Sequence, residues 1–375
     1  MMSSISGRNT RNSAFEVCRI IAMLMIVACH FATHGGFSFT NTEITLPRLW
    51  WSFLKMGGNF GVDVFVLISG YFLIENKKTA VNFKKCLLFW GQLIFYSVVI
   101  FAFGILTHRV DFSVKSVAKA IMPITFNSWW FASTYFVMFL LHPYINRLLY
   151  SLEKKRYQKM LMLLGIMWCI IPTLTSSSYQ ANVLVEFFLL YSIAGYIKIH
   201  GLNPKGTSKR YLVFWLVLTA ATYLSCVVLM GLGTRIALFS GRSTFFYGRT
   251  KLPTLPCAIC FFMIFEKMPA WNNKAINTIS SAAFGVYLLH DSSILRPMIW
   301  KDIFKNASYQ DTWQIIPHSI FAVLAVYVVC SVIDLIRIYT VDILYRKAVD
   351  RYADPLIKPF SKASRWLSAR MFGKE

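Results

Sequence analysis

The sequence predicts an all-α fold, a polytopic membrane helical bundle of about ten transmembrane helices with both termini cytoplasmic. Hydrophobic residues make up 56% of the 375 residues and charged residues only 15%, whereas soluble domains are about a quarter charged. Apolar runs of roughly 20 residues, the length that spans a bilayer, recur along the chain. Runs of this length exclude the strands of a membrane barrel, so helices are the expected spanning elements.

Ten apolar stretches are expected to form these helices. They lie near residues 14–34, 49–75, 84–107, 130–149, 159–177, 181–199, 211–231, 252–268, 276–296 and 314–345. The first is too long for the apolar region of a signal peptide, so it is expected to stay as a membrane helix. The last exceeds what a bilayer needs and is expected to extend into the cytoplasm. The predicted organisation is a single transmembrane domain over residues 1–345 and a basic cytoplasmic tail over 346–375.

The distribution of cations predicts the orientation. The net charge is +23, and with the N-terminus inside, the inner segments hold 25 Lys and Arg against 11 in the outer loops. Cytoplasmic loops of membrane proteins collect Lys and Arg, so both termini are placed inside. This rule accounts for the cations without a nucleic-acid partner, and the basic tail is expected to lie on anionic lipid headgroups.

One predicted outer loop departs from that rule. Residues 232–251 carry Arg235, Arg242, Arg249 and Lys251. The loop either tolerates these cations or binds an anionic ligand such as a phosphate-bearing substrate. The eight cysteines fall in or beside apolar runs, which argues against a disulfide framework, and the scattered histidines predict no metal site.

The first predicted helix holds two ionisable residues, Arg19 and His30. Eleven residues are close to three helical turns, so both side chains are expected on one face, separated by about 16 Å along the axis. Taken singly, Arg19 is explained by snorkelling to the headgroups and His30 by packing. Together on one face of one membrane helix they form a candidate site.

Asp63 lies near the middle of the second predicted helix, where Gly57, Gly58 and Gly61 allow another helix to approach closely. An acid at that depth needs a partner. Asp63 is expected to orient the histidine or to neutralise the arginine of the first helix, or else to form a buried pair that only fixes packing. Ser69 follows on the same helix, either as a nucleophile or as a serine bonded to its own backbone.

His290 and Glu186 are further candidates near the predicted outer face. His290 ends an apolar run and is either a second polar residue of the site or a helix cap, and Glu186 lies on the outer part of the sixth helix. Motifs for dinucleotide binding, phosphate loops, zinc peptidases and serine hydrolases are missing from the sequence. The ionisable residues inside the membrane therefore carry the functional argument.

The order of these residues resembles the membrane acyltransferase-three family, multi-pass O-acyltransferases that modify bacterial surface polysaccharides. Four segments carry the resemblance: Arg11-Asn12 with Phe15-Glu16 leading to Arg19 and His30, then Gly61 to Tyr71, Trp129-Trp130-Phe131, and Ser280 to His290. The resemblance implies transfer of an acyl group, usually acetyl from cytoplasmic acetyl-CoA, to a hydroxyl of a surface or lipid-linked polysaccharide. It also implies a multi-pass protein of the bacterial cytoplasmic membrane, with acyl-CoA as a substrate and no bound cofactor.

The family's pattern of Arg, ten residues and His falls on Arg19 and His30. The resemblance implies a site role for Asp63 and supporting roles for Ser69 and His290. Acyl transfer to a hydroxyl needs a base, and His is the usual choice because its pKa lies near neutral. Arg19, nearer the cytoplasm, is suited to the phosphates or thioester end of CoA.

Two other functions fit the same residues. A transporter or flippase of envelope precursors would use the buried charges as a polar pathway. A non-catalytic partner in an envelope-assembly complex would use them only to set helix pairing.

Overall fold

The computed structural model describes residues 11–39, 43–76 and 80–372, and within these ranges the chain is helical and has no strand. Seven helices of the described chain are long and apolar enough to cross a membrane. They are α1 (Ser13–His34), α2 (Leu46–Leu73), α3 (Phe83–Leu106), the run from α6 (Lys154–Gly165) to α7 (Ile171–Thr175), α8 (Val183–His200), α9 (Ser208–Gly233) and the run that begins with α14 (Ile315–Tyr339). The predicted helical membrane bundle is confirmed, while the count of ten and the cytoplasmic termini stay predictions.

The other three predicted spans, 130–149, 252–268 and 276–296, differ in how much of each is one helix. α5 (Trp130–Ser151) is a full-length helix with Pro143 inside it, and α10 (Thr254–Glu266) has 13 residues. The prediction of one helix over 276–296 is wrong: α11 (Lys274–Ser281) and α12 (Ala283–His290) meet at Ala282. After α12 come Asp291, Ser292 and Ser293, residue types that favour caps and turns over helix interiors. The chain then continues through α13 (Leu295–Pro297), η4 (Met298–Ile303) and η5 (Asn306–Tyr309).

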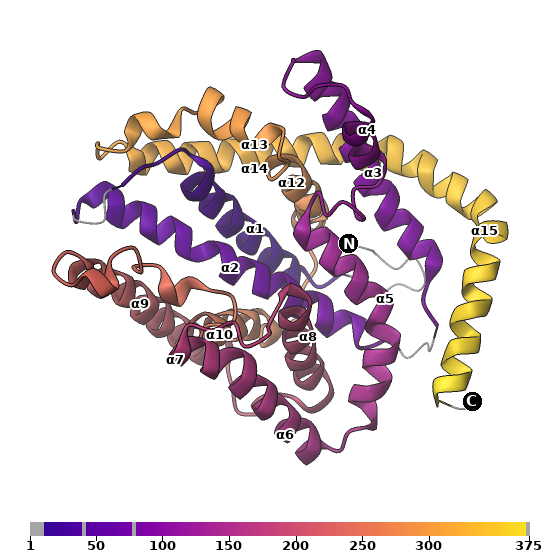
Figure 1. The fold of residues 1–375 in the computed structure, drawn as a ribbon. Coiled ribbons are helices and arrows are strands. Elements are labelled where there is room, and N and C mark those ends of the chain that lie inside the picture. Colours follow the sequence, from indigo (N-terminus) through magenta and orange to yellow (C-terminus); the bar gives the residue numbers. More distant parts are fainter. Residues whose placement is uncertain (1–10, 40–42, 77–79, 373–375) are drawn as a thin grey trace.

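α1 and α2 lie side by side at the centre of the molecule (Figure 1). Glycines on α2 make this possible: a Cβ atom at Gly61 would lie 2.6 Å from the Ala22 carbonyl oxygen, and one at Gly58 would overlap the Cys29 side chain. The predicted close approach at these glycines is confirmed, and α1 is the helix that approaches.

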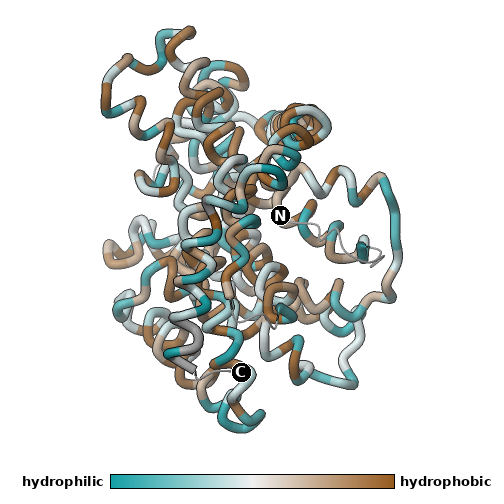
Figure 2. Tube along the Cα trace, turned by 90° about the vertical axis from the view of Figure 1, so that its right-hand side faces the viewer, coloured by the Kyte–Doolittle hydropathy of each residue, from teal (hydrophilic) through white to brown (hydrophobic). Residues whose placement is uncertain are grey.

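Two groups of helices flank this central pair. α12 and α14 pack on α1, whereas α8 and α10 pack on α2 and α9 covers α10. Hydrophobic residues occur on the peripheral helices as well as in the interior (Figure 2). α9, for example, exposes Phe214 and Val217. An apolar outer surface of this kind fits contact with lipid chains.

The helix between Lys154 and Thr175 contains one π-helical turn, η1 (Ile166–Ile170), which ends two residues before Pro172. Proline has no N–H to continue the hydrogen-bond ladder, and π turns commonly absorb such interruptions. The short helix α4 (Val114–Ile121) lies in the connection between α3 and α5.

The basic C-terminal segment is a helix, α15 (Val341–Phe372), that packs on α3. The Tyr345 hydroxyl donates to the Leu87 carbonyl (2.9 Å), and Lys84 pairs with Asp354 (3.3 Å). The predicted domain boundary at 345/346 falls inside α15. Four of the cations counted on the inner side lie outside the described residues: Arg8, Lys77, Lys78 and Lys374.

Candidate active site

α1 carries both residues of the predicted Arg and His pair on one uninterrupted helix. It begins at an N-cap, Asn12, whose side chain accepts from the Ala14 amide (3.1 Å), and runs for 22 residues. No proline or glycine interrupts it, so the helical spacing between Arg19 and His30 holds over its whole length.

Arg19 lies in a polar cluster at the start of α1. Its Nη1 is 2.7 Å from Glu16 Oε1, and the Ser280 hydroxyl of α11 donates to Glu16 Oε2 (2.6 Å). The guanidinium also lies over the Phe72 ring, 5.9 Å from its centroid. Glu16, and not Asp63, therefore neutralises Arg19.

His30 lies against His290, the last residue of α12. His290 Nδ1 is 2.6 Å from the Val286 carbonyl oxygen. A carbonyl oxygen only accepts hydrogen bonds, so Nδ1 carries a proton, and Nε2 of the neutral ring is an acceptor. His30 Nδ1 lies 2.9 Å from that Nε2 and therefore donates to it. This chain of bonds leaves Nε2 of neutral His30 unprotonated, as the basic nitrogen of the pair.

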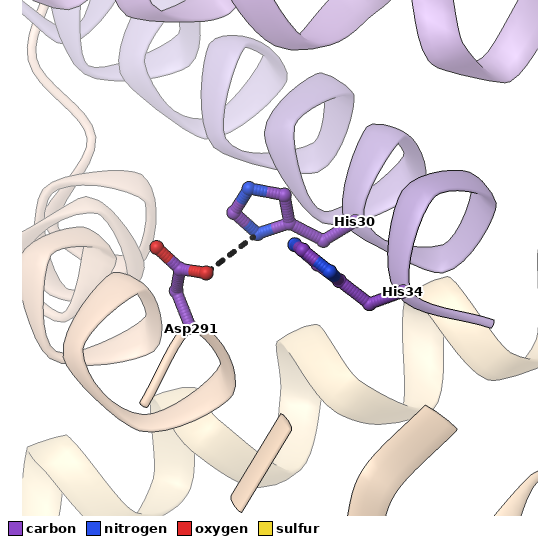
Figure 3. A group of neighbouring side chains, drawn as sticks. All are labelled: His30, His34 and Asp291. Atoms are coloured by element: carbon purple, nitrogen blue, oxygen red, sulfur yellow. Dashed lines mark ion pairs between the residues drawn. The ribbon is translucent and has the colours of Figure 1, made fainter. Parts of the chain in front are cut away.

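Asp291, His34 and Arg296 surround the histidine pair. Figure 3 shows His30 and His34 side by side on α1 with Asp291 facing them. Asp291 Oδ1 lies 3.6 Å from His30 Nδ1 and 3.5 Å from Arg296 Nη1. The carboxylate can thus stabilise a positive charge that forms on His30.

The possible metal-ligating atoms of His30, His34 and Asp291 lie within 4.8 Å of one another. Arg296 Nη1 already reaches two of these groups, lying 3.2 Å from His34 Nε2 besides its contact with Asp291. A guanidinium only donates hydrogen bonds and is always charged. The positive charge of Arg296 would repel a divalent cation bound there. His30 Nδ1 already forms a hydrogen bond with His290 and is not free to bind a metal. The chemistry of this cluster fits a hydrogen-bond relay better than a metal centre.

A cavity of about 30 Å³ lies beside the pair, between α1, α2, α5 and α12. Its ionisable lining residues are His30 and Asp291, and the aromatic side chains of Trp130 and Tyr287 also line it. The rest of the wall is apolar: Met23, Ile26, Val62, Phe65, Phe131 and Phe284. The volume holds about two waters, so a thioester arm needs side-chain movement to enter.

Asp63 is fully buried on α2, and neither of its carboxylate oxygens has a hydrogen-bond partner among the described residues. The charges that act on it come from Arg249 and Glu186. These two form an ion pair of 2.6 Å, and the Arg249 guanidinium lies over the Trp130 ring, 4.9 Å from its centroid. Glu186 and Arg249 therefore form a second polar group, whose charges act on Asp63.

The remaining predicted residues lie away from the histidine pair. Ser69 hydrogen-bonds the Tyr135 side chain. Arg235 and Arg242 are exposed on the loop after α9 and make no ion pair within the described part of the chain. Of the three loop arginines, only Arg249 forms an ion pair within the described residues, with Glu186 of α8.

Sequence reasoning missed four residues of this site as candidates: Glu16, Asp291, His34 and Arg296. Two of them had a readable signal, since Glu16 is three residues before Arg19 and His34 four after His30, which places each pair on one helix face. Asp291 adjoins His290 in the sequence, but its contact with His30 depends on how α12 packs against α1. Arg296 lies beyond the end of α12 and had no such signal.

A pair of histidines, His290 fully buried and His30 largely buried, beside a cavity inside a helical membrane bundle is the arrangement expected of a membrane-embedded enzyme site. Residues 12–335 match the family model described as an acyltransferase domain. The chain belongs to this family, the acyltransferase-three family of membrane O-acyltransferases, and the resemblance seen in the sequence is confirmed. The matched region contains Arg19, His30 and His290. Comparisons with curated proteins and with solved structures gave no match.

Proposed function

We propose that this membrane acyltransferase moves an acetyl group from cytoplasmic acetyl-CoA to a hydroxyl of a surface or lipid-linked polysaccharide. The bond from His30 Nδ1 to His290 Nε2 carries the proposal, because it leaves His30 Nε2 as a base beside the cavity. In the reaction, His30 Nε2 takes the proton of the acceptor hydroxyl as its oxygen attacks the thioester carbonyl carbon. The carbon–sulfur bond then breaks, and the CoA sulfur takes the proton from His30.

The surroundings of His30 support a base that becomes charged during the reaction. The imidazolium formed on proton transfer keeps its Nδ1 proton toward His290, with the Asp291 carboxylate 3.6 Å away. The apolar lining of the cavity limits water, which would otherwise compete with the acceptor hydroxyl for the acyl group. His290 acts through His30 and is a positioning residue.

Arg19 is proposed to meet the phosphates of CoA at the opposite end of α1. A phosphate would compete with Glu16 for the guanidinium, and Glu16 would keep its bond from Ser280. The axial spacing of about 16 Å along α1 separates the donor's phosphate end from the reacting carbonyl. The proposed setting is the cytoplasmic membrane of a bacterium, with the donor inside and the acceptor outside.

The proposal is tested by the O-acetyl content of surface glycan, measured by NMR in a deletion strain. The strain would carry the intact gene, His30→Ala or Arg19→Gln, with equal amounts of protein in the membrane. O-acetyl signals are expected with the intact gene alone, and the shifted sugar protons would identify the acceptor. Equal O-acetyl content with the intact gene and with His30→Ala would refute the base role, and proton-coupled movement of a substrate without CoA release would favour a transporter.

A further inference from the structure

A second and larger hollow lies directly beyond the histidine pair. It has a volume of about 400 Å³, within the range of pockets that hold small ligands. Its walls come from four parts of the chain: α3, the segment containing α4, the residues just before α5 and the residues just after α12. We call it the serine–lysine groove after its polar lining: Ser97, Ser113, Lys115, Ser116, Lys119, Ser128, Ser292 and Ser293.

Two pairs of consecutive residues separate this groove from the His30 cavity. Asp291 lines the cavity and Ser292 the groove, while Trp130 lines the cavity and Trp129 the groove. The Trp129 indole N–H donates to the Leu288 carbonyl (3.1 Å), which ties this wall to α12. A ligand in the groove therefore lies one residue layer from the proposed base.

The charge of the groove favours an anion. Lys115 and Lys119 are four residues apart on α4, so they share one helix face, and both are exposed. Neither makes an ion pair within the described ranges, and no acidic side chain lines the groove. Arg109, which precedes the α4 segment, forms an ion pair with Asp302 at 2.8 Å.

The serines favour a ligand rich in hydroxyl groups. A serine hydroxyl both donates and accepts, which matches the hydroxyls of a sugar. Ser113 and Ser116 are used in the N-terminal cap of α4. The hydroxyls of Ser97, Ser128 and Ser293 make no hydrogen bond within the described part of the chain, so they are available to a ligand.

We propose that the serine–lysine groove binds an acidic sugar, one that carries a carboxylate or a phosphate, as the acceptor subsite. This inference rests on the proposed function, because the acceptor is taken to be a glycan at this end of the bundle. The same anionic chemistry occurs in lipid headgroups, and α4 also exposes Val114 and Ile121, which can contact a bilayer surface. The test therefore separates the two sources.

Binding would be measured with the full chain in nanodiscs of zwitterionic lipid, using a disaccharide of glucuronic acid and N-acetylglucosamine, with chitobiose as the neutral control. Each charge contact of an exposed lysine changes affinity by a few fold. Lys115→Gln/Lys119→Gln is thus expected to weaken binding of the acidic disaccharide by about tenfold and leave chitobiose unaffected. The matched control, Lys154→Gln/Lys155→Gln on α6, removes the same charge elsewhere and is expected to bind like the wild type.

Salt provides a second readout, since added salt should weaken binding to the wild type and have less effect on the α4 variant. The proposal is overturned if the acidic disaccharide does not bind, or if the α4 variant binds it like the wild type. Displacement of the disaccharide by anionic lipid, with no effect of the α4 variant on the sugar, would assign the groove to lipid. CoA release is followed in the same samples: lysine-dependent binding without CoA release would uphold the groove and refute the proposed function.

Discussion

Replacement of His290 with alanine removes the acceptor of the His30 Nδ1 proton. The His30 side chain is 18% exposed, and a largely buried donor left without an acceptor costs about 1–3 kcal/mol. The missing acceptor matters most in the transition state, where His30 takes on positive charge. An added barrier of about 1–3 kcal/mol corresponds to a loss in kcat of about 5- to 150-fold. Asp291 Oδ1, at 3.6 Å, is the nearest replacement acceptor, so the lower part of this range is expected. His290→Gln keeps an acceptor oxygen and is expected to lose less.

The assay is CoA release by purified protein in nanodiscs, with kcat and the KM for acetyl-CoA measured separately. KM is expected to change less than twofold, because Arg19 and Glu16 lie at the other end of α1. His142→Ala is the matched control: His142 is also fully buried, on α5, and bonded to Asn76 (3.0 Å). It should lower thermal stability without lowering kcat per folded molecule. A kcat for His290→Ala within twofold of the wild type would refute the argument that His290 holds the Nδ1 proton of His30 and so keeps Nε2 as the base.

Two further predictions concern packing and charge, each read from melting temperatures in detergent. Gly58→Ala places a methyl group against Cys29 and should lower the free energy of unfolding by about 1–3 kcal/mol, because it separates α1 from α2. The control, Gly165→Ala, places its methyl group in open space and should change stability little. Equal losses of stability in the two variants would contradict the close approach of α1 and α2. Arg249→Gln leaves the Glu186 side chain, 14% exposed, without its partner and should cost about 1–3 kcal/mol. Adding Glu186→Gln should restore part of that loss, and the absence of any recovery would show that the pair is not coupled.

The sequence alone determined the membrane-helical class and most of the helix positions, and it singled out the two ionisable residues of α1 as candidates. Each spanning helix must satisfy its own backbone hydrogen bonds and present apolar surface, so its signature is local and readable. Arg19 and His30 stood out for the same reason, since a charged or titratable group in such a segment is costly wherever the rest of the chain lies. The glycines of α2 likewise predicted a close contact with another helix, although they did not indicate which helix.

Only the tertiary structure decided which residues are partners. His30 meets His290 across 260 positions of sequence, and Arg19 pairs with Glu16, while the Asp63 carboxylate has no hydrogen bond to either residue of the first helix. The break at Ala282, which the sequence did not predict, lets Ser280 reach Glu16 and His290 reach His30 from two short helices. Partner choice depends on the rotation and register of each helix against its neighbours. These are set by the shapes of side chains far apart in the sequence, whereas a hydropathy pattern records only which segments enter the membrane.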